Sequence, residues 1–156
     1  MIISSILENK DKERRISITP EIIKKYINLG FEVHLAKDYG LHLGLQDKIF
    51  ETAGAKVISD EAEIIQNSDI IIQFDLIDDK KLSLMKEKNI FIGSFSSYEH
   101  KEKINKLKTK KVNIFSLELL PRITRAQSMD ILSSQANLAG YKAVVEAFAF
   151  FEKAIP

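Results

Sequence analysis

One dense cluster of polar side chains, within residues 121–134, has residue types that can bind and orient a planar polar ligand. Arg122 offers a rigid fork of donors, Gln127 offers donors and an acceptor, Asp130 offers acceptors, and Ser133 offers a rotatable hydroxyl. Together such groups can hold a carboxamide and fix the plane of the ring that carries it. On chemistry alone, a capped loop with an Arg–Asp ion pair explains the same residues equally well.

The other residue types argue against the common catalytic centres. His34, His42 and His100 have no second histidine or carboxylate at metal-ligand spacing, so we expect no zinc or iron site. The absence of cysteine excludes a thiolate ligand or nucleophile. Because no Gly-x-Ser-x-Gly elbow, Walker loop or Gly-x-Gly-x-x-Gly fingerprint occurs, we expect no phosphate cradle for a dinucleotide within these residues.

The composition is that of one soluble globular domain. The 156 residues suffice for a single core, and 45% of them are hydrophobic and 29% charged. Lys and Arg total 23 against 22 Asp and Glu, so the charge gives no reason to expect a nucleic-acid partner. The longest apolar runs are far shorter than the roughly 20 residues of a membrane span, and no signal peptide is apparent. With no cysteine, we expect a cytoplasmic protein.

Short β-branched runs alternate with amphipathic helical patterns up to residue 116. The predicted strands are Ile2–Ile6, Phe31–Ala36, Lys56–Ile58, Asp69–Phe74, Asn89–Ser94 and Val112–Ser116. The predicted helices are Pro20–Leu29, Gln46–Ala53, Asp60–Asn67, Asp78–Lys86 and Glu99–Lys108. Thr19 as a cap, Pro20 at the first helical position and Gly30 after the last mark the first helix. The alternation predicts a three-layer, flavodoxin-like α/β fold, with a mainly parallel sheet and helices on both faces.

The polar cluster follows the last predicted strand, so we expect it at the carboxyl edge of the sheet, where ligands of open α/β folds bind. A long C-terminal helix is predicted from Gln127 to about Lys153, and after Leu138 it is apolar nearly all around its axis. Such a helix needs cover on more than one side. We therefore expect a partner or a further domain to pack against it; a terminal helix tucked into its own domain is the alternative.

The polar cluster and the helix after it resemble a signature of the proton-translocating NAD(P) transhydrogenases. The similarity is to the alpha subunit, the NAD(H)-side component, and covers residues 121–144, Pro-Arg-Ile-Thr-Arg-Ala-Gln-Ser-Met-Asp-Ile-Leu-Ser-Ser-Gln-Ala-Asn-Leu-Ala-Gly-Tyr-Lys-Ala-Val. Residues 13–20, with the helix and Gly30 that follow, resemble the opening shared by transhydrogenases and alanine dehydrogenases. Phe50–Ala55 fits the same family, so the resemblance spans nearly the whole chain.

This resemblance implies a domain organisation and a role for the cluster. Residues 1–124 would form an N-terminal α/β domain, and residues 125–156 a nicotinamide-positioning loop and a long inter-domain helix; the family's Rossmann NAD-binding domain is absent from the sequence. By motif position, Arg122, Gln127 and Asp130 would set the nicotinamide of NAD(H) for hydride transfer, with Ser133 as a further contact. The chain would be part of an enzyme that moves a hydride from NADH to NADP⁺ and would not be competent alone.

The resemblance also implies partners. These are the Rossmann NAD-binding domain, a component that binds NADP(H), and a membrane component that couples hydride transfer to proton flow. A homodimer is expected in the complete assembly. The protein would be cytoplasmic and peripheral to the inner membrane through its partner subunits, with no membrane span of its own.

Departures from the family pattern bear on two alternatives. Alanine dehydrogenases carry a lysine where this chain has Gln73, and transhydrogenases commonly keep it; alanine dehydrogenases also use a histidine where this chain has Phe95–Tyr98. Both losses count against an alanine dehydrogenase-like domain, because amino-acid oxidation needs a charged partner and a proton acceptor. The other alternative is a non-catalytic truncated remnant or assembly domain. The missing nucleotide domain favours that alternative, and the intact loop opposes it.

Overall fold

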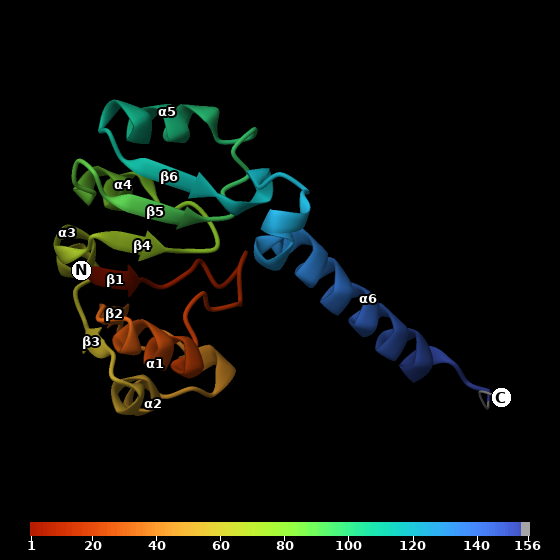
Figure 1. The fold of residues 1–156 in the computed structure, drawn as a ribbon. Coiled ribbons are helices and arrows are strands. Elements are labelled where there is room, and N and C mark those ends of the chain that lie inside the picture. The colour runs from red at the N-terminus through yellow and green to blue at the C-terminus, as the bar shows by residue number, and fades with distance from the viewer. Residues whose placement is uncertain (154–156) are drawn as a thin grey trace. The chain divides into compact units, whose positions relative to one another are not determined.

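The computed structural model describes residues 1–153, which form six strands, six α-helices and three 3₁₀ turns (Figure 1). The strands are β1 (Ile2–Ser5), β2 (Glu32–Ala36), β3 (Lys56–Ile58), β4 (Ile70–Ile72), β5 (Ile90–Gly93) and β6 (Asn113–Ser116). The α-helices are α1 (Pro20–Asn28), α2 (Asp47–Ala53), α3 (Glu61–Asn67), α4 (Asp79–Leu84), α5 (Lys101–Thr109) and α6 (Ile131–Phe150). The 3₁₀ turns are η1 (Leu41–Leu43), η2 (Leu117–Leu119) and η3 (Thr124–Met129). The predicted strands and helices up to residue 116 are confirmed, with small differences at their ends.

The six strands are parallel and form one sheet in the order β3-β2-β1-β4-β5-β6. Ile3 of β1 is opposite Val33 of β2 on one side and Ile70 of β4 on the other. This is the 3-2-1-4-5-6 order of Rossmann-type sheets, and it differs from the predicted flavodoxin-like order by the additional edge strand β3. The predicted parallel α/β fold is therefore confirmed. The direction in which strands are added reverses between β1 and β4, which makes this pair the topological switch point of the sheet.

Helices cover both faces of the sheet, and a buried apolar cluster fills the space on each face. On one face, Ile23 of α1 and Phe50 of α2 pack with Val33 and Leu35 of β2. On the other face, α3, α4 and α5 supply the apolar side chains that pack with Ile71 of β4. These two clusters form the hydrophobic core of the layered fold.

Local capping explains where several helices begin. Asp60 accepts a hydrogen bond from the Ala62 N–H at 2.8 Å, and Asp78 accepts one from the Lys81 N–H at 2.9 Å, so α3 and α4 each start at an aspartate. Thr19 is the N-cap residue of α1, as predicted, but its side chain makes no capping hydrogen bond. The start of α1 is marked instead by proline at its first position, where the missing N–H costs nothing.

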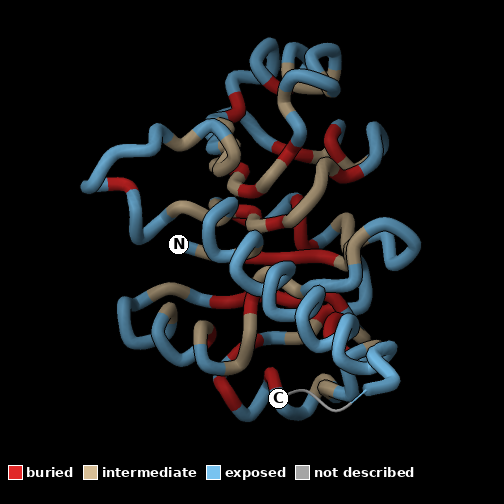
Figure 2. The backbone as a smooth tube through the Cα atoms, turned by 90° about the vertical axis from the view of Figure 1, so that its right-hand side faces the viewer, coloured by how far each residue is buried: buried red, intermediate tan, exposed pale blue. Residues whose placement is uncertain are grey.

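The chain divides into two compact units, Met1–Ser116 with the sheet and Leu117–Pro156 with η2, η3 and α6. The predicted boundary at residues 124 and 125 stays a prediction about the family's domains. The predicted C-terminal helix is confirmed, but it begins at Ile131 and not at Gln127, because Thr124–Met129 form η3 and Asp130 caps α6. No residue of α6 is buried (Figure 2). Among residues 1–153, no helix combines the length and the apolar character that crossing a membrane requires.

Candidate functional site

The four predicted ligand-binding side chains lie on consecutive pieces of local structure in the second unit. Arg122 follows η2, Gln127 is in η3, Asp130 is the N-cap of α6, and Ser133 is in the first turn of α6. One cavity of about 300 Å³ is lined by these four and by Pro121, Ile123 and Thr124. The structure therefore brings together all four residues that the sequence singles out, while their role toward a nucleotide stays a prediction.

Asp130 is held in place by the helix that it caps. Its Oδ1 accepts hydrogen bonds from the N–H groups of Leu132 at 3.0 Å and Ser133 at 3.1 Å, and its Oδ2 accepts one from the Ser133 hydroxyl at 2.6 Å. The Ser133 hydroxyl, followed by the N–H groups of α6, holds the pKa of Asp130 below its usual value. Asp130 is therefore an anion at neutral pH, and the first turn of α6 sets its orientation.

Arg122 is exposed and forms no salt bridge within residues 1–153. Its positive charge lowers the pKa of Asp130 less than the hydrogen bonds from Ser133 and Leu132 do. The Arg–Asp ion pair that competes with ligand binding as an explanation of the cluster is therefore not formed at salt-bridge distance. The guanidinium keeps its fork of N–H donors available beside the cavity.

The donors and acceptors of this cavity match the polar end of a nicotinamide. A carboxamide presents one carbonyl acceptor and one N–H₂ group. Arg122 and the Gln127 amide can donate to the carbonyl, and the Ser133 hydroxyl oxygen, whose proton goes to Asp130, can accept from the N–H₂ group together with Asp130. Such bonds fix the plane of a ring that carries the carboxamide, which is the contribution that a positioning site makes to hydride transfer.

Gln73, where alanine dehydrogenases carry a lysine, is buried directly after β4. Its Oε1 accepts hydrogen bonds from the Ser5 hydroxyl at 2.6 Å and from the Ile6 N–H at 2.9 Å. Its Nε2 has no hydrogen-bond partner within the described residues. Because a lysine ammonium has donors only, it cannot accept the bond from Ile6. Gln73 is therefore a structural link between the ends of β1 and β4.

We expect Gln73→Met to lower the free energy of unfolding by about 1–3 kcal/mol, because it preserves volume but leaves the buried Ile6 N–H without its acceptor. The measurement is the urea midpoint at unchanged slope. The matched control is Gln66→Met on the exposed face of α3, where the change should stay within about 0.5 kcal/mol. Equal midpoints for both variants would show that the bond to Ile6 contributes nothing.

The opening motif at residues 13–20 ties the loop after β1 to the end of β4. Arg15 Nε donates to Glu13 at 2.8 Å, and the Arg15 guanidinium lies 4.3 Å from the centre of the Phe74 ring. The hydrogen bond from Arg15 holds the pKa of Glu13 below its usual value. The motif therefore has a structural role at the switch point of the sheet.

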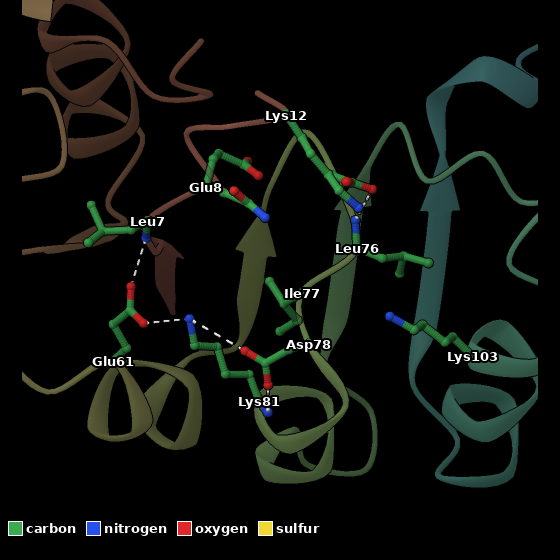
Figure 3. Close-up of a pocket in the computed structure, with 11 residues that line it drawn as sticks. Leu7, Glu8, Lys12, Glu61, Leu76, Ile77, Asp78, Lys81 and Lys103 are labelled. Carbon is green, nitrogen blue, oxygen red and sulfur yellow. Dashed lines mark hydrogen bonds and ion pairs between the residues drawn. The ribbon is translucent and has the colours of Figure 1, made fainter. Parts of the chain in front are cut away.

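A second cavity, of about 370 Å³, lies in the first unit beyond the ends of β1 and β4 (Figure 3). Its lining includes Glu8 and Lys12 from the loop after β1, Asp75 and Asp78 from the loop after β4, and Lys103 from α5. These residues form no motif in the sequence, because they come from distant segments that only the strand order brings together. The described residues contain no group of three or more His, Asp or Glu side chains that could hold a metal ion.

The chain is similar to proteins of one family. Residues 6–139 match the family model for the alanine dehydrogenase/PNT N-terminal domain. The first part of the NAD(P) transhydrogenase subunit alpha of Rickettsia prowazekii (strain Madrid E) is 40% identical over 160 residues, which cover 100% of this chain and 42% of that protein. The protein of the same name from Rhodospirillum rubrum is 34% identical, over 96% of this chain and 40% of its own length.

A solved structure agrees with these relatives. The crystal structure of transhydrogenase from Sinorhizobium meliloti superposes with a TM-score of 0.90 at 35% identity. The superposition covers 100% of this chain and 46% of that one. The chain therefore spans less than half the length of the proteins that it matches.

Proposed function

Since the chain belongs to the alanine dehydrogenase/PNT N-terminal domain family, we propose that it is the N-terminal domain of the alpha subunit of a proton-translocating NAD(P) transhydrogenase. In that assembly it contributes to hydride transfer from NADH to NADP⁺. The observation that carries this proposal is the single cavity lined by Arg122, Gln127, Asp130 and Ser133, the residues that the family motif assigns to the nicotinamide.

The four residues act in this proposal by binding and orienting. NAD(H), when bound, supplies the hydride, while NADP(H) belongs to a partner component. Arg122, Gln127 and Ser133 hold the carboxamide, and the Asp130 carboxylate, fixed by its capping bonds, limits rotation of the ring. Positioning of this kind can supply a large share of the rate enhancement without a protein nucleophile or a general acid.

The exposed apolar surface of α6 supports the proposal of further domains. Leu138, Tyr141, Val144 and Phe148 are all exposed large side chains of this helix. These four lie along one face of the helix, whereas Leu132 and Phe150, which are also exposed, lie on the opposite face. More than one neighbour is therefore needed to cover the helix. We assign these neighbours to the Rossmann NAD-binding domain and to a second copy in a homodimer. Attachment to the inner membrane is then indirect, through the membrane component.

Two observations argue against the alanine dehydrogenase alternative. The position of the family's lysine is taken by a neutral amide, Gln73, whose acceptor oxygen is engaged by Ser5 and Ile6. The stretch Phe95–Tyr98 has no histidine to accept a proton. Amino-acid oxidation is therefore not the function that we assign.

The direct test is reconstitution of hydride transfer. The chain, combined with the nucleotide-binding and membrane components, should reduce an NADP⁺ analogue with NADH. Omission of the chain should abolish this reaction. A complex that reacts at the same rate without it, or NAD⁺-dependent oxidation of alanine by the complete assembly, would contradict the proposal.

We expect residues 1–156 alone to bind NADH with a dissociation constant weaker than about 1 mM, because no phosphate-binding glycine turn occurs in them. Isothermal titration calorimetry checks this result. Micromolar binding would require roughly 8 kcal/mol of affinity and therefore a second nucleotide site in this chain.

A further inference from the structure

The cavity beyond β1 and β4 lies where open α/β sheets bind ligands. β1 and β4 are neighbours in the sheet, and the order of strands reverses between them. At such a switch point the loops after the two strands leave on opposite faces, so a crevice opens between them. Here the crevice has a volume of about 370 Å³, which is enough for a small molecule. The polar cluster at residues 122–133 is not part of it.

The carboxylates of this cavity already have partners. Glu61 accepts from the Leu7 N–H at 2.9 Å and from Lys81 at 2.7 Å, and Asp78 accepts from the Lys81 N–H at 2.9 Å. Asp75 accepts from the Leu76 N–H at 2.7 Å. Glu8 accepts from the Phe74 N–H at 2.5 Å and so links the two loops of the switch point. None of these oxygens is arranged with others as a metal site within residues 1–153.

Two of the three lysines in the cavity, unlike the carboxylates, have no hydrogen-bond or ion-pair partner for their charged group within residues 1–153. Lys81 is paired with Glu61 and Asp78, but the ammonium groups of Lys12 and Lys103 form no ion pair or hydrogen bond among the described residues. Figure 3 shows their side chains extending toward the cavity from two different segments, the loop after β1 and helix α5. Two ammonium groups of the cavity are thus without an acceptor within the described residues, whereas each carboxylate accepts at least one hydrogen bond.

We propose that the switch-point cavity binds a small oxyanion, a carboxylate or a tetrahedral phosphate-like anion, on the ammonium groups of Lys12 and Lys103. Charge-assisted hydrogen bonds from two ammonium groups are the interactions that such an anion needs. This inference is independent of the nicotinamide assignment, because the two sites share no residue.

Glu8 makes this binding depend on protons. The ionisable groups lining the cavity are Glu8, Glu61, Asp75, Asp78, Lys12, Lys81 and Lys103. Glu13 and Arg15, outside the lining, also act on Glu8, but they form a salt bridge with each other and add no net charge. With Glu8 ionised, the four carboxylates outnumber the three ammonium groups; with Glu8 protonated, the two signs balance. Burial raises the pKa of Glu8 to about 7, against the lowering effect of the Phe74 and Asp75 N–H groups and with the help of the Glu13 and Asp75 charges.

The sign of the coupling follows from these charges. A bound anion disfavours the Glu8 carboxylate, so its pKa rises further in the complex and a proton is taken up on binding. Affinity should therefore be highest below the free pKa of about 7 and fall as the pH rises through it. For a single group of this pKa, binding at pH 6 should be about tenfold tighter than at pH 8.

The test is a titration of residues 1–156 with sodium sulfate or sodium acetate at constant ionic strength, followed by the amide signals of Phe74 and Leu76 in NMR spectra at pH 6 and pH 8. Neither probe changes its own charge over this range. Whichever of sulfate and acetate has the lower dissociation constant identifies the class of anion, tetrahedral or carboxylate. The expected result is saturable binding that is about tenfold stronger at pH 6. Shifts that do not saturate, or that chloride reproduces equally, would overturn the proposal.

Variants test separately whether Lys12 and Lys103 bind the anion and whether Glu8 makes the binding depend on pH. Lys12→Gln and Lys103→Gln should each weaken binding about tenfold, whereas Lys10→Gln and Lys101→Gln, matched lysines outside the cavity, should not change it. Glu8→Gln should bind at pH 8 as tightly as the wild type does at pH 6 and should lose the pH dependence. Unchanged affinity in the double variant of Lys12 and Lys103 would show that the anion binds elsewhere, and pH dependence that persists in Glu8→Gln would remove Glu8 from the coupling.

Discussion

Arg122→Ala in the complete transhydrogenase assembly should slow hydride transfer about 100-fold and leave most NADH affinity intact. The guanidinium lines the cavity that we assign to the nicotinamide, and small misplacement of a reacting ring has a large effect on rate. The adenosine and pyrophosphate contacts are expected on the nucleotide-binding domain. Because Arg122 is exposed and has no salt bridge within residues 1–153, its removal should change stability by no more than about 0.5 kcal/mol.

Asp130→Asn should have an effect of similar size on the rate. Asparagine is as good an N-cap as aspartate, so α6 should keep its start while the negative charge beside the ring is lost. Arg125→Ala is the matched control, because Arg125 lies between the two tested residues, in η3, and is exposed but does not line the cavity. Single-turnover hydride transfer and a melting curve check all three variants. Wild-type rates for Arg122→Ala and Asp130→Asn would show that the cluster caps α6 but does not position the nicotinamide.

Gly93→Ala should lower the free energy of unfolding of the first unit by about 3 kcal/mol or more. This is the upper end of the cost that is usual when an extra methyl group is forced into a well-packed core. A Cβ atom at Gly93 would collide with the carbonyl oxygen of Gln73 and with the ring of Phe95. Neither group can move away easily, because the Gln73 side chain is hydrogen-bonded to Ile6 and the centres of the Phe95 and Phe91 rings are 4.3 Å apart. In a domain of this size the melting temperature should fall by about 6–12 °C.

The matched control is Gly140→Ala in α6, where no atom lies within 4 Å of the new Cβ. Alanine is the better helix former by about 1 kcal/mol, so this variant should be neutral or slightly more stable. Thermal and urea unfolding of both variants give the comparison. Equal stability of Gly93→Ala and the wild type would mean that β4 and β5 can separate at little cost.

Local patterns were enough to predict the secondary structure of the sheet domain. β-branched runs such as Ile70–Ile72 and helical patterns such as residues 60–67 depend on residues close together in the chain, so the sequence shows them directly. The differences are local too. Thr19 is the N-cap residue of α1 without making the capping hydrogen bond, and the helix expected from Gln127 begins at Ile131, because residues 124–129 form a 3₁₀ turn and Asp130 caps α6.

The composition and the local arrangement of the polar cluster at residues 122–133 could also be predicted from the sequence. Asp130 bonds to Leu132 and Ser133, two and three residues away, and the whole lining of its cavity falls within residues 121–133. A cluster held by neighbours in the chain can be recognised as a motif from the order of its residues alone. Its protonation state follows from the same short-range bonds.

The cavity beyond β1 and β4, in contrast, exists only because of the tertiary structure. Glu8 bonds to Phe74 and Gln73 to Ile6 across 66 and 67 positions of the chain, and both contacts exist only because β4 is added beside β1 after the chain has built β2 and β3 on the other side. Hydrophobic periodicity reports which residues face a core but not which strand lies next to which. That choice depends on the handedness of the crossovers and on packing between distant segments. It places Glu8 where burial raises its pKa, and it gives Gln73 its structural role between the ends of β1 and β4.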